Sequence, residues 1–146
     1  MDVIEIAAII VIGAVGCAEF GSATMVHPVI RKLSVDEQLV FEKGLLTPFG
    51  RVMPIGMTAA VVLGIILTIA SPSGWLITAA VSLGLALAVT IIGNVPINLR
   101  TGRIRETSAP EDFIAMRRRW DVFQIVRATL QLIGFVLVTI GVVSGT

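Results

Sequence analysis

Four long apolar stretches dominate the pattern of hydrophobic and polar positions along the chain. They cover approximately residues 3–26, 54–70, 75–95 and 122–143. A helix needs roughly 20 apolar residues to cross the hydrocarbon core of a bilayer, where every backbone amide must be bonded internally. The pattern therefore predicts an all-α fold, an integral membrane four-helix bundle. The second stretch is short unless residues 47–53 continue its helix, with a kink at Pro54.

The three connections between these stretches differ in charge. Residues 71–74 form an uncharged turn followed by Trp75, which suits a membrane interface. Residues 31–51 and 100–119 instead carry 10 of the 11 lysines and arginines. Because positive loops stay in the cytoplasm, we expect a multi-pass protein of the cell inner membrane with both termini outside and both basic loops cytoplasmic.

Each basic loop also predicts a short interfacial helix. Ser34 is followed by two acidic residues, and Ser108 is followed by Pro110 and Glu111. Hydroxyl N-caps, an early proline and first-turn carboxylates are typical of helix starts. The Arg117–Trp120 cluster is then expected at the lipid headgroups, as a topology signal or, alternatively, as a site for anionic lipid.

Composition supports a single membrane domain spanning residues 1–146. Hydrophobic residues make up 55% of the chain and charged residues only 14%, whereas soluble domains are about one quarter charged. No basic segment is long enough for a nucleic-acid-binding domain, so nucleic acid is not an expected partner. Cys17 is the only cysteine, which excludes an internal disulfide.

Glu19 and His27 are ionisable groups in or beside the first span. Because charge in hydrocarbon is costly, Glu19 should be neutral or paired with a cation. It is either a structural ion-pair partner or a proton acceptor or metal ligand. His27 precedes Pro28, where the helix should stop, so it either caps an interface or takes part in catalysis. One histidine is weak evidence for metal, and a site of Glu19, His27 and Glu42 stays open.

Two further polar groups of residues fall near the basic ends of the later spans. Asn94 and Asn98 share a helix face beside Pro96, which frees a backbone carbonyl; they predict a ligand-binding corner or helix-packing contacts. Arg127 should reach the interface or pair with Glu19 or Asn98. It belongs to a helical stripe made of Trp120, Gln124, Arg127 and Gln131. Since these features converge on one half of the bundle, they predict a small-molecule pocket.

At these residues the sequence resembles the anthrone oxygenase-like family of small four-span membrane proteins, mostly bacterial and mostly of unknown function. The resemblance rests on four segments: His27-Pro28, Phe49–Pro54, Asn94–Asn98 and Arg119–Arg127. Named members are similar to cofactor-independent oxygenases that oxidise a phenolic anthrone to an anthraquinone. The resemblance implies roles for Asn98, Trp120 and Arg127.

These features lead to three hypotheses. The first is a membrane-embedded redox enzyme for a lipophilic substrate. Its catalytic residues would be Glu19, His27 and Arg127, and its substrate-binding residues Asn94, Asn98, Trp120 and Gln124. The second is a structural or accessory subunit of a larger membrane complex, and the third is a small transporter or channel. The expected partners are the lipid bilayer, a lipophilic small molecule, and further subunits in a homo-oligomer or a complex. No cofactor is assigned.

Overall fold

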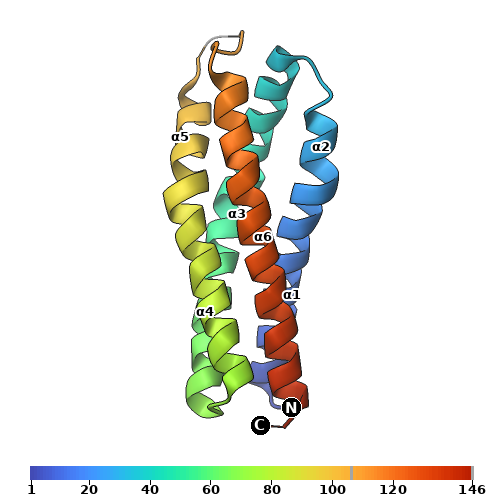
Figure 1. The fold of residues 1–146 in the computed structure, drawn as a ribbon, viewed down its shortest axis with the longest axis vertical. Coiled ribbons are helices and arrows are strands. Elements are labelled where there is room, and N and C mark those ends of the chain that lie inside the picture. The colour runs from blue at the N-terminus through green and yellow to red at the C-terminus, as the bar shows by residue number, and fades with distance from the viewer. Residues whose placement is uncertain (106, 146) are drawn as a thin grey trace.

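The computed structural model describes residues 1–105 and 107–145, and all regular secondary structure within them is helical. The helices form four rods, in chain order. The first rod is α1 (Val3–Gly21), the π-helix η1 (Ser22–Val26) and α2 (His27–Ile30); the second is α3 (Val35–Ala70); the third is α4 (Gly74–Val89), the π-helix η2 (Thr90–Asn94) and α5 (Val95–Arg103); the fourth is α6 (Phe113–Val143). The rods lie side by side, with both termini at one end (Figure 1).

All four rods are long and apolar enough to cross a membrane. Large apolar side chains cover their outer faces, and Ile10, Ile69 and Ile92, for example, are more than half exposed. Such a surface would be unfavourable in water and is suited to acyl chains. The predicted fold class, a four-helix membrane bundle, is confirmed.

The helices predicted in the two basic loops are not separate elements but the first turns of α3 and α6, and the start predicted at Ser108 was wrong because α6 begins at Phe113 after Asp112. Ser34 caps α3 by accepting from the Glu37 amide, and the Glu37 carboxylate accepts from the Ser34 amide in return. From this capping box α3 continues past Pro48 and Pro54 to Ala70 without interruption. Residues 47–53 therefore do extend the second span. The long rods leave only short connections at the basic end.

The two π-helices each precede a proline in the same way. We expected the first helix to stop before Pro28, and this was wrong because the rod continues to Ile30. A proline lacks an amide proton and crowds the carbonyl four residues earlier. The preceding turn is widened instead: the His27 amide donates to the Ser22 carbonyl, and the Val95 amide, before Pro96, donates to the Thr90 carbonyl. Single π-turns of this kind are frequent at functional sites.

Close packing of small residues holds the bundle together at the end that carries the termini. The buried apolar cluster there includes Ile12, Leu83 and Val138. A Cβ added to Gly134 of α6 would lie 2.6 Å from Leu83 Cδ2 and 2.8 Å from Leu83 Cγ. The absent side chain thus lets α4 and α6 approach each other, which replaces the hydrophobic driving force that is missing in lipid.

Replacing Gly134 by alanine should therefore lower the free energy of unfolding by about 1–3 kcal/mol, the usual cost of overpacking. Gly84→Ala in α4 is the matched control, because a Cβ there meets nothing within 4 Å. Unfolding in mixed detergent micelles measures both. Equal stability of the two variants would contradict the assigned contact.

Candidate functional site

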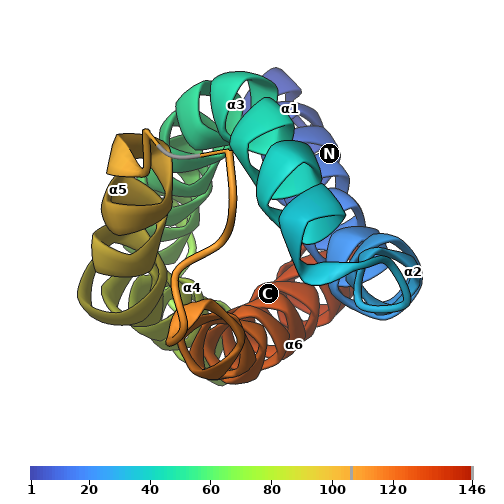
Figure 2. The same cartoon turned by 90° about the horizontal axis from the view of Figure 1, so that it is seen from above.

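A cavity of about 420 Å³ lies inside the bundle at the basic end. Viewed from that end, the four rods form a ring (Figure 2). All four rods contribute to the cavity wall, which is mostly apolar with a few polar side chains. The polar or ionisable lining residues are Ser22, His27, Glu42, Thr90, Asn98, Arg103, Trp120 and Arg127. An apolar cavity with a few convergent polar groups is the usual form of a small-molecule site.

The deepest polar contacts join α1 to α6 through a buried ion pair. Arg127 Nη2 lies 2.8 Å from Glu19 Oε2. Gln124 connects the same two residues: its amide donates to Glu19 Oε2 at 2.7 Å and its oxygen accepts from Arg127 Nε at 2.8 Å. Arg127 Nη1 also donates to the Thr90 hydroxyl at 3.3 Å. The expected pairing of Arg127 with Glu19 is present, and it fixes the guanidinium at the cavity wall.

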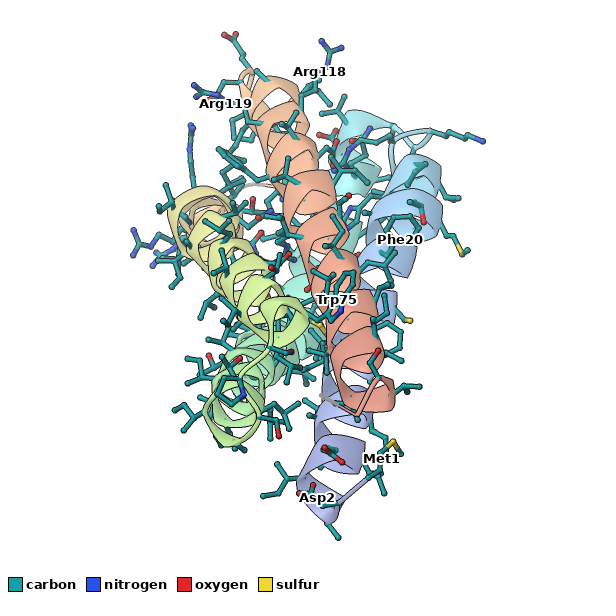
Figure 3. All side chains as sticks on the ribbon, turned by 60° about the horizontal axis from the view of Figure 1, so that its bottom comes forward. Met1, Asp2, Phe20, Trp75, Arg118 and Arg119 are labelled. Atoms are coloured by element: carbon teal, nitrogen blue, oxygen red, sulfur yellow. The ribbon has the colours of Figure 1, made fainter. Side chains whose placement is uncertain are left out.

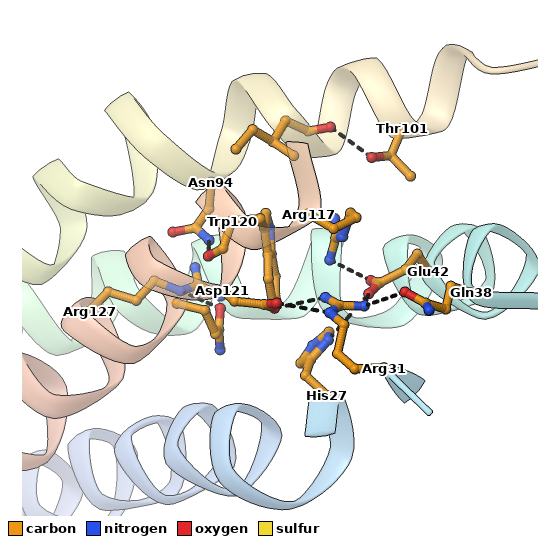
Figure 4. A network of polar contacts seen from close by, with 12 residues as sticks. His27, Arg31, Gln38, Glu42, Asn94, Thr101, Arg117, Trp120, Asp121 and Arg127 are labelled. Carbon is orange, nitrogen blue, oxygen red and sulfur yellow. Dashed lines mark hydrogen bonds and ion pairs between the residues drawn. The ribbon is translucent and has the colours of Figure 1, made fainter. Parts of the chain in front are cut away.

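A second network, nearer the loops, centres on the buried carboxylate of Glu42. Arg117 Nη2 lies 2.6 Å from Glu42 Oε2, and Arg31 Nη1 lies 2.8 Å from Glu42 Oε1. His27 Nδ1 lies 3.3 Å from the same Oε1. Arg31 also binds both carboxylate oxygens of Asp121, at 2.7 and 2.8 Å. The network joins three of the rods (Figure 4).

Charges in the two networks balance. Arg31, Arg117 and Arg127 face Glu42, Asp121 and Glu19, so the sum is zero when His27 is neutral. Burial of Arg31 works against its charge, but hydrogen bonds to Asp121 and Glu42 outweigh burial and raise the pKa of Arg31 above its ordinary value. Arg31 therefore stays charged.

Trp120 connects the second network to the cavity. Its ring centroid lies 4.4 Å from the His27 ring and 4.3 Å from the Arg117 guanidinium carbon. The indole nitrogen is buried and has no hydrogen-bond partner among the described residues, and the same holds for Asn98 Oδ1. Since an unpaired buried donor or acceptor costs free energy, these cavity-lining atoms suit a ligand with matching polar groups.

The structure divides the predicted site residues into two groups. His27, Asn98, Trp120 and Arg127 line the cavity. The other three contact residues of that group. Glu19 and Gln124 hold Arg127, and the Asn94 amide donates to the Trp120 carbonyl at 3.3 Å. On this geometry we assign Glu19, Gln124 and Asn94 as positioning residues.

Sequence reasoning placed the Arg117–Trp120 cluster at the headgroups, and for two of its members this was wrong. Arg117 is 1% exposed and Trp120 is 5% exposed, because they lie three residues apart on the inward face of α6. Arg118 and Arg119 point outward (Figure 3). The Arg31–Asp121 and Glu42–Arg117 pairs were also missed. The helical spacing of Arg117 and Asp121 with Gln124 was the available signal.

Among the described residues, no three His, Cys, Asp or Glu side chains come together in a cluster that could hold a metal ion. Glu19 pairs with Arg127, while His27 and Glu42 share the second network. The donor set instead suits an aromatic or ketonic ring, with donors from Arg127 and Trp120 and a flat indole against which a ring can stack.

Neither a curated protein nor a solved structure matches the chain. A family model described as "Anthrone oxygenase" matches residues 39–137. The matched segment runs from the first turns of α3 into the last third of α6 and includes Asn98, Trp120 and Arg127. It covers about two thirds of the chain, and the chain belongs to the anthrone oxygenase family.

Proposed function

We propose that the chain is a membrane-embedded oxygenase that binds a neutral, lipophilic ring ketone or phenol in the cavity and oxidises an activated CH₂ group with dioxygen. The observation that carries this proposal is the position of His27. It lines the cavity, lies against the Trp120 ring and has Nδ1 3.3 Å from the Glu42 carboxylate. Arg127 and Asn98 supply the polar wall.

His27 is the general base in this proposal. His27 Nδ1 lies 3.3 Å from the Glu42 carboxylate without a hydrogen bond to it; in the tautomer that we assign, Nδ1 carries the proton on this side and Nε2 is the basic nitrogen of the neutral ring. A base oriented by a carboxylate in this way can remove a proton from the carbon next to an aromatic or carbonyl system. Glu19 binds Arg127 and Gln124 and is not among the residues that line the cavity, so we do not assign that task to it.

Charge balance in the site favours a neutral substrate. Arg31, Arg117 and Arg127 already have carboxylate partners, and Arg103 is exposed at the edge of the cavity, so a permanently charged group deep in the cavity would be unpaired at low dielectric. When His27 takes a proton, the substrate anion and the imidazolium form together and balance. Contacts with Glu19, Gln124, Thr90 and Met57 fix the Arg127 guanidinium at the cavity wall, and its remaining Nη2 proton is the donor that we assign to the developing oxyanion.

The overall change is R₂CH₂ + O₂ → R₂C=O + H₂O. The carbanion donates its electron pair to dioxygen, and the resulting peroxide takes up a proton from the His27 imidazolium. Loss of the second C–H proton to His27 breaks the O–O bond, forms the carbonyl and releases hydroxide, which takes that proton to give water. Carbon is oxidised by four electrons and dioxygen is reduced by four.

The test is oxygen uptake by purified protein in vesicles supplied with a hydroxylated anthrone. We expect one dioxygen consumed for each anthraquinone formed, at a rate proportional to the protein added. Protein-free vesicles measure spontaneous oxidation. Product formation at the protein-free rate would refute the proposed activity.

A further inference from the structure

The cavity extends outward to the face of the bundle where α3 and α5 lie next to each other. Several cavity-lining residues are exposed on the outer surface as well, and all but Val26 of these belong to α3 or α5. The exposed lining residues on these two helices are Gly50, Pro54, Leu99, Gly102 and Arg103. A residue that both lines the cavity and is exposed marks an opening.

Contacts between the helices bound this opening at both ends. Toward the loops, Lys43 Nζ of α3 contacts the Ile104 carbonyl, just after α5. Toward the termini, Thr90 Oγ1 lies 3.5 Å from Met57 Sδ. Between these contacts the helices face each other through residues 49–54 and 95–99, all within rods that are long and apolar enough to cross a membrane. The opening is a window in the side of the bundle.

Two glycines keep the window clear. A Cβ on Gly50 would meet nothing within 4 Å, and one on Gly102 would come no nearer than 3.5 Å, to Leu46 Cδ1. Unlike Gly134, neither glycine is needed for helix packing. Their effect is to leave space between α3 and α5.

The surface beside the window is apolar toward the termini and carries the exposed Arg51 and Arg103 toward the loops, so the part nearer the termini opens toward acyl chains. Val52, Ile55 and Leu99 are large, apolar and exposed beside it. The polar lining groups His27 and Trp120 are buried instead. An amphiphile in the cavity would therefore have its polar ring inside the bundle and its apolar part at the window.

We propose that the window between α3 and α5 is a subsite for an alkyl or isoprenoid chain, so that the natural ligand is a ring compound carrying an apolar tail. The inference relies on the proposed function only for the chemistry of the ring. The bound ring lies near His27 and Trp120, and the tail passes between Gly50 and Leu99 into the surrounding lipid.

Binding without turnover tests this inference separately from the oxygenase activity. The chain has two tryptophans, and Trp75→Phe leaves Trp120 in the cavity as the only indole. In vesicles, quenching of Trp120 fluorescence then measures the Kd of anthraquinone with and without an n-octyl chain. Each probe partitions equally into vesicles holding wild type or variant, so differences in Kd report the site.

Gly50→Phe should raise the Kd of the octyl probe at least about tenfold, because the phenyl ring would occupy the space of the tail and a tail forced past it would be overpacked. The Kd of the unsubstituted probe should change less than about twofold, because this probe has no tail in the window. Gly44→Phe is the matched control, since Gly44 is also on α3, exposed and open to a Cβ, but does not line the cavity. It should leave both values unchanged.

Gly102→Phe narrows the window from α5 and replaces Gly50→Phe if that variant does not fold. An unchanged Kd for the octyl probe in a folded window variant would overturn the proposal. Equal weakening of both probes would also overturn it, since the obstruction would then affect the ring site and not a tail subsite. Neither result depends on whether the protein consumes oxygen.

Discussion

Replacing His27 by alanine is expected to lower kcat for anthrone oxidation by about 10²–10⁴-fold, the usual contribution of a general base. The reason is that His27 is the only histidine of the chain and lines the cavity, while the nearby carboxylates of Glu19 and Glu42 are held by arginines. KM should change much less, because Asn98, Trp120 and Arg127 still bind the ring. Steady-state oxygen uptake measures both constants.

Added imidazole shows whether the His27→Ala variant has lost activity because the general base is missing or because the protein is misfolded. The deleted ring leaves a space beside Trp120, and free imidazole should enter it and restore part of the turnover. Thr24→Val is the control on the same rod, because its hydroxyl is exposed and donates only to the Phe20 carbonyl. Full activity of His27→Ala without imidazole would mean that another group removes the proton.

Replacing Glu19 by alanine is expected to lower the free energy of unfolding by about 3–5 kcal/mol, the cost of leaving a buried charge unpaired. Glu19 is fully buried, and its carboxylate is the only one that contacts Arg127 among the described residues. Without it the guanidinium remains among apolar side chains with only neutral donors and acceptors nearby. Unfolding in mixed micelles, followed by circular dichroism, gives the value.

The double variant Glu19→Leu with Arg127→Met distinguishes the effect of losing the whole ion pair from the effect of leaving one charge unpaired. Removing both charges should recover most of the lost stability, because an apolar replacement of a buried ion pair is often neutral or stabilising. Activity should not return, since Arg127 supplies the oxyanion donors. Glu111→Ala removes an exposed carboxylate and should change stability by less than about 0.5 kcal/mol. A Glu19→Ala variant as stable as Glu111→Ala would show that the pair does not form.

The sequence predicted the bundle, and for the same physical reason it offered the deeper ion pair as one of three alternatives for Arg127, beside Asn98 and the membrane interface. Apolar runs of spanning length permit only helices in lipid, and an acid and an arginine at similar depth must meet inside them. The pairing of Glu19 with Arg127 could therefore be inferred from their positions within the first and fourth apolar runs. The cavity-lining roles of Asn98 and Trp120 followed from resemblance and helical spacing.

The second network could not be predicted in the same way. Its residues lie outside the apolar runs, where a charged side chain is expected to meet water and needs no buried partner. Arg31, Arg117 and Asp121 fall in segments that the hydropathy pattern assigns to water or headgroups. Their burial follows from the continuation of α3 and α6 beyond the apolar runs and from which side of α6 faces inward. Mean hydropathy is averaged over a window of residues, so it does not show which face of a helix points into the bundle.

The widened turns before Pro28 and Pro96 were likewise not predictable from residue type. A proline in a helical pattern signals a break or a kink. Whether the helix ends before the proline or continues through a turn with one extra residue depends on how the rest of the rod packs. Here the extra residue carries His27 and Asn94 to inward positions, where both are buried.

The arrangement of the buried charges has a consequence for how the protein is made. The N-terminal hairpin, up to Ala70, contributes Glu19, Arg31 and Glu42, one negative charge in excess; the C-terminal hairpin contributes Arg117, Asp121 and Arg127, one positive charge in excess. Each hairpin alone would therefore leave one buried charge without a partner in the bilayer. We therefore expect the first hairpin to be stable in a bilayer only after the second has been inserted beside it.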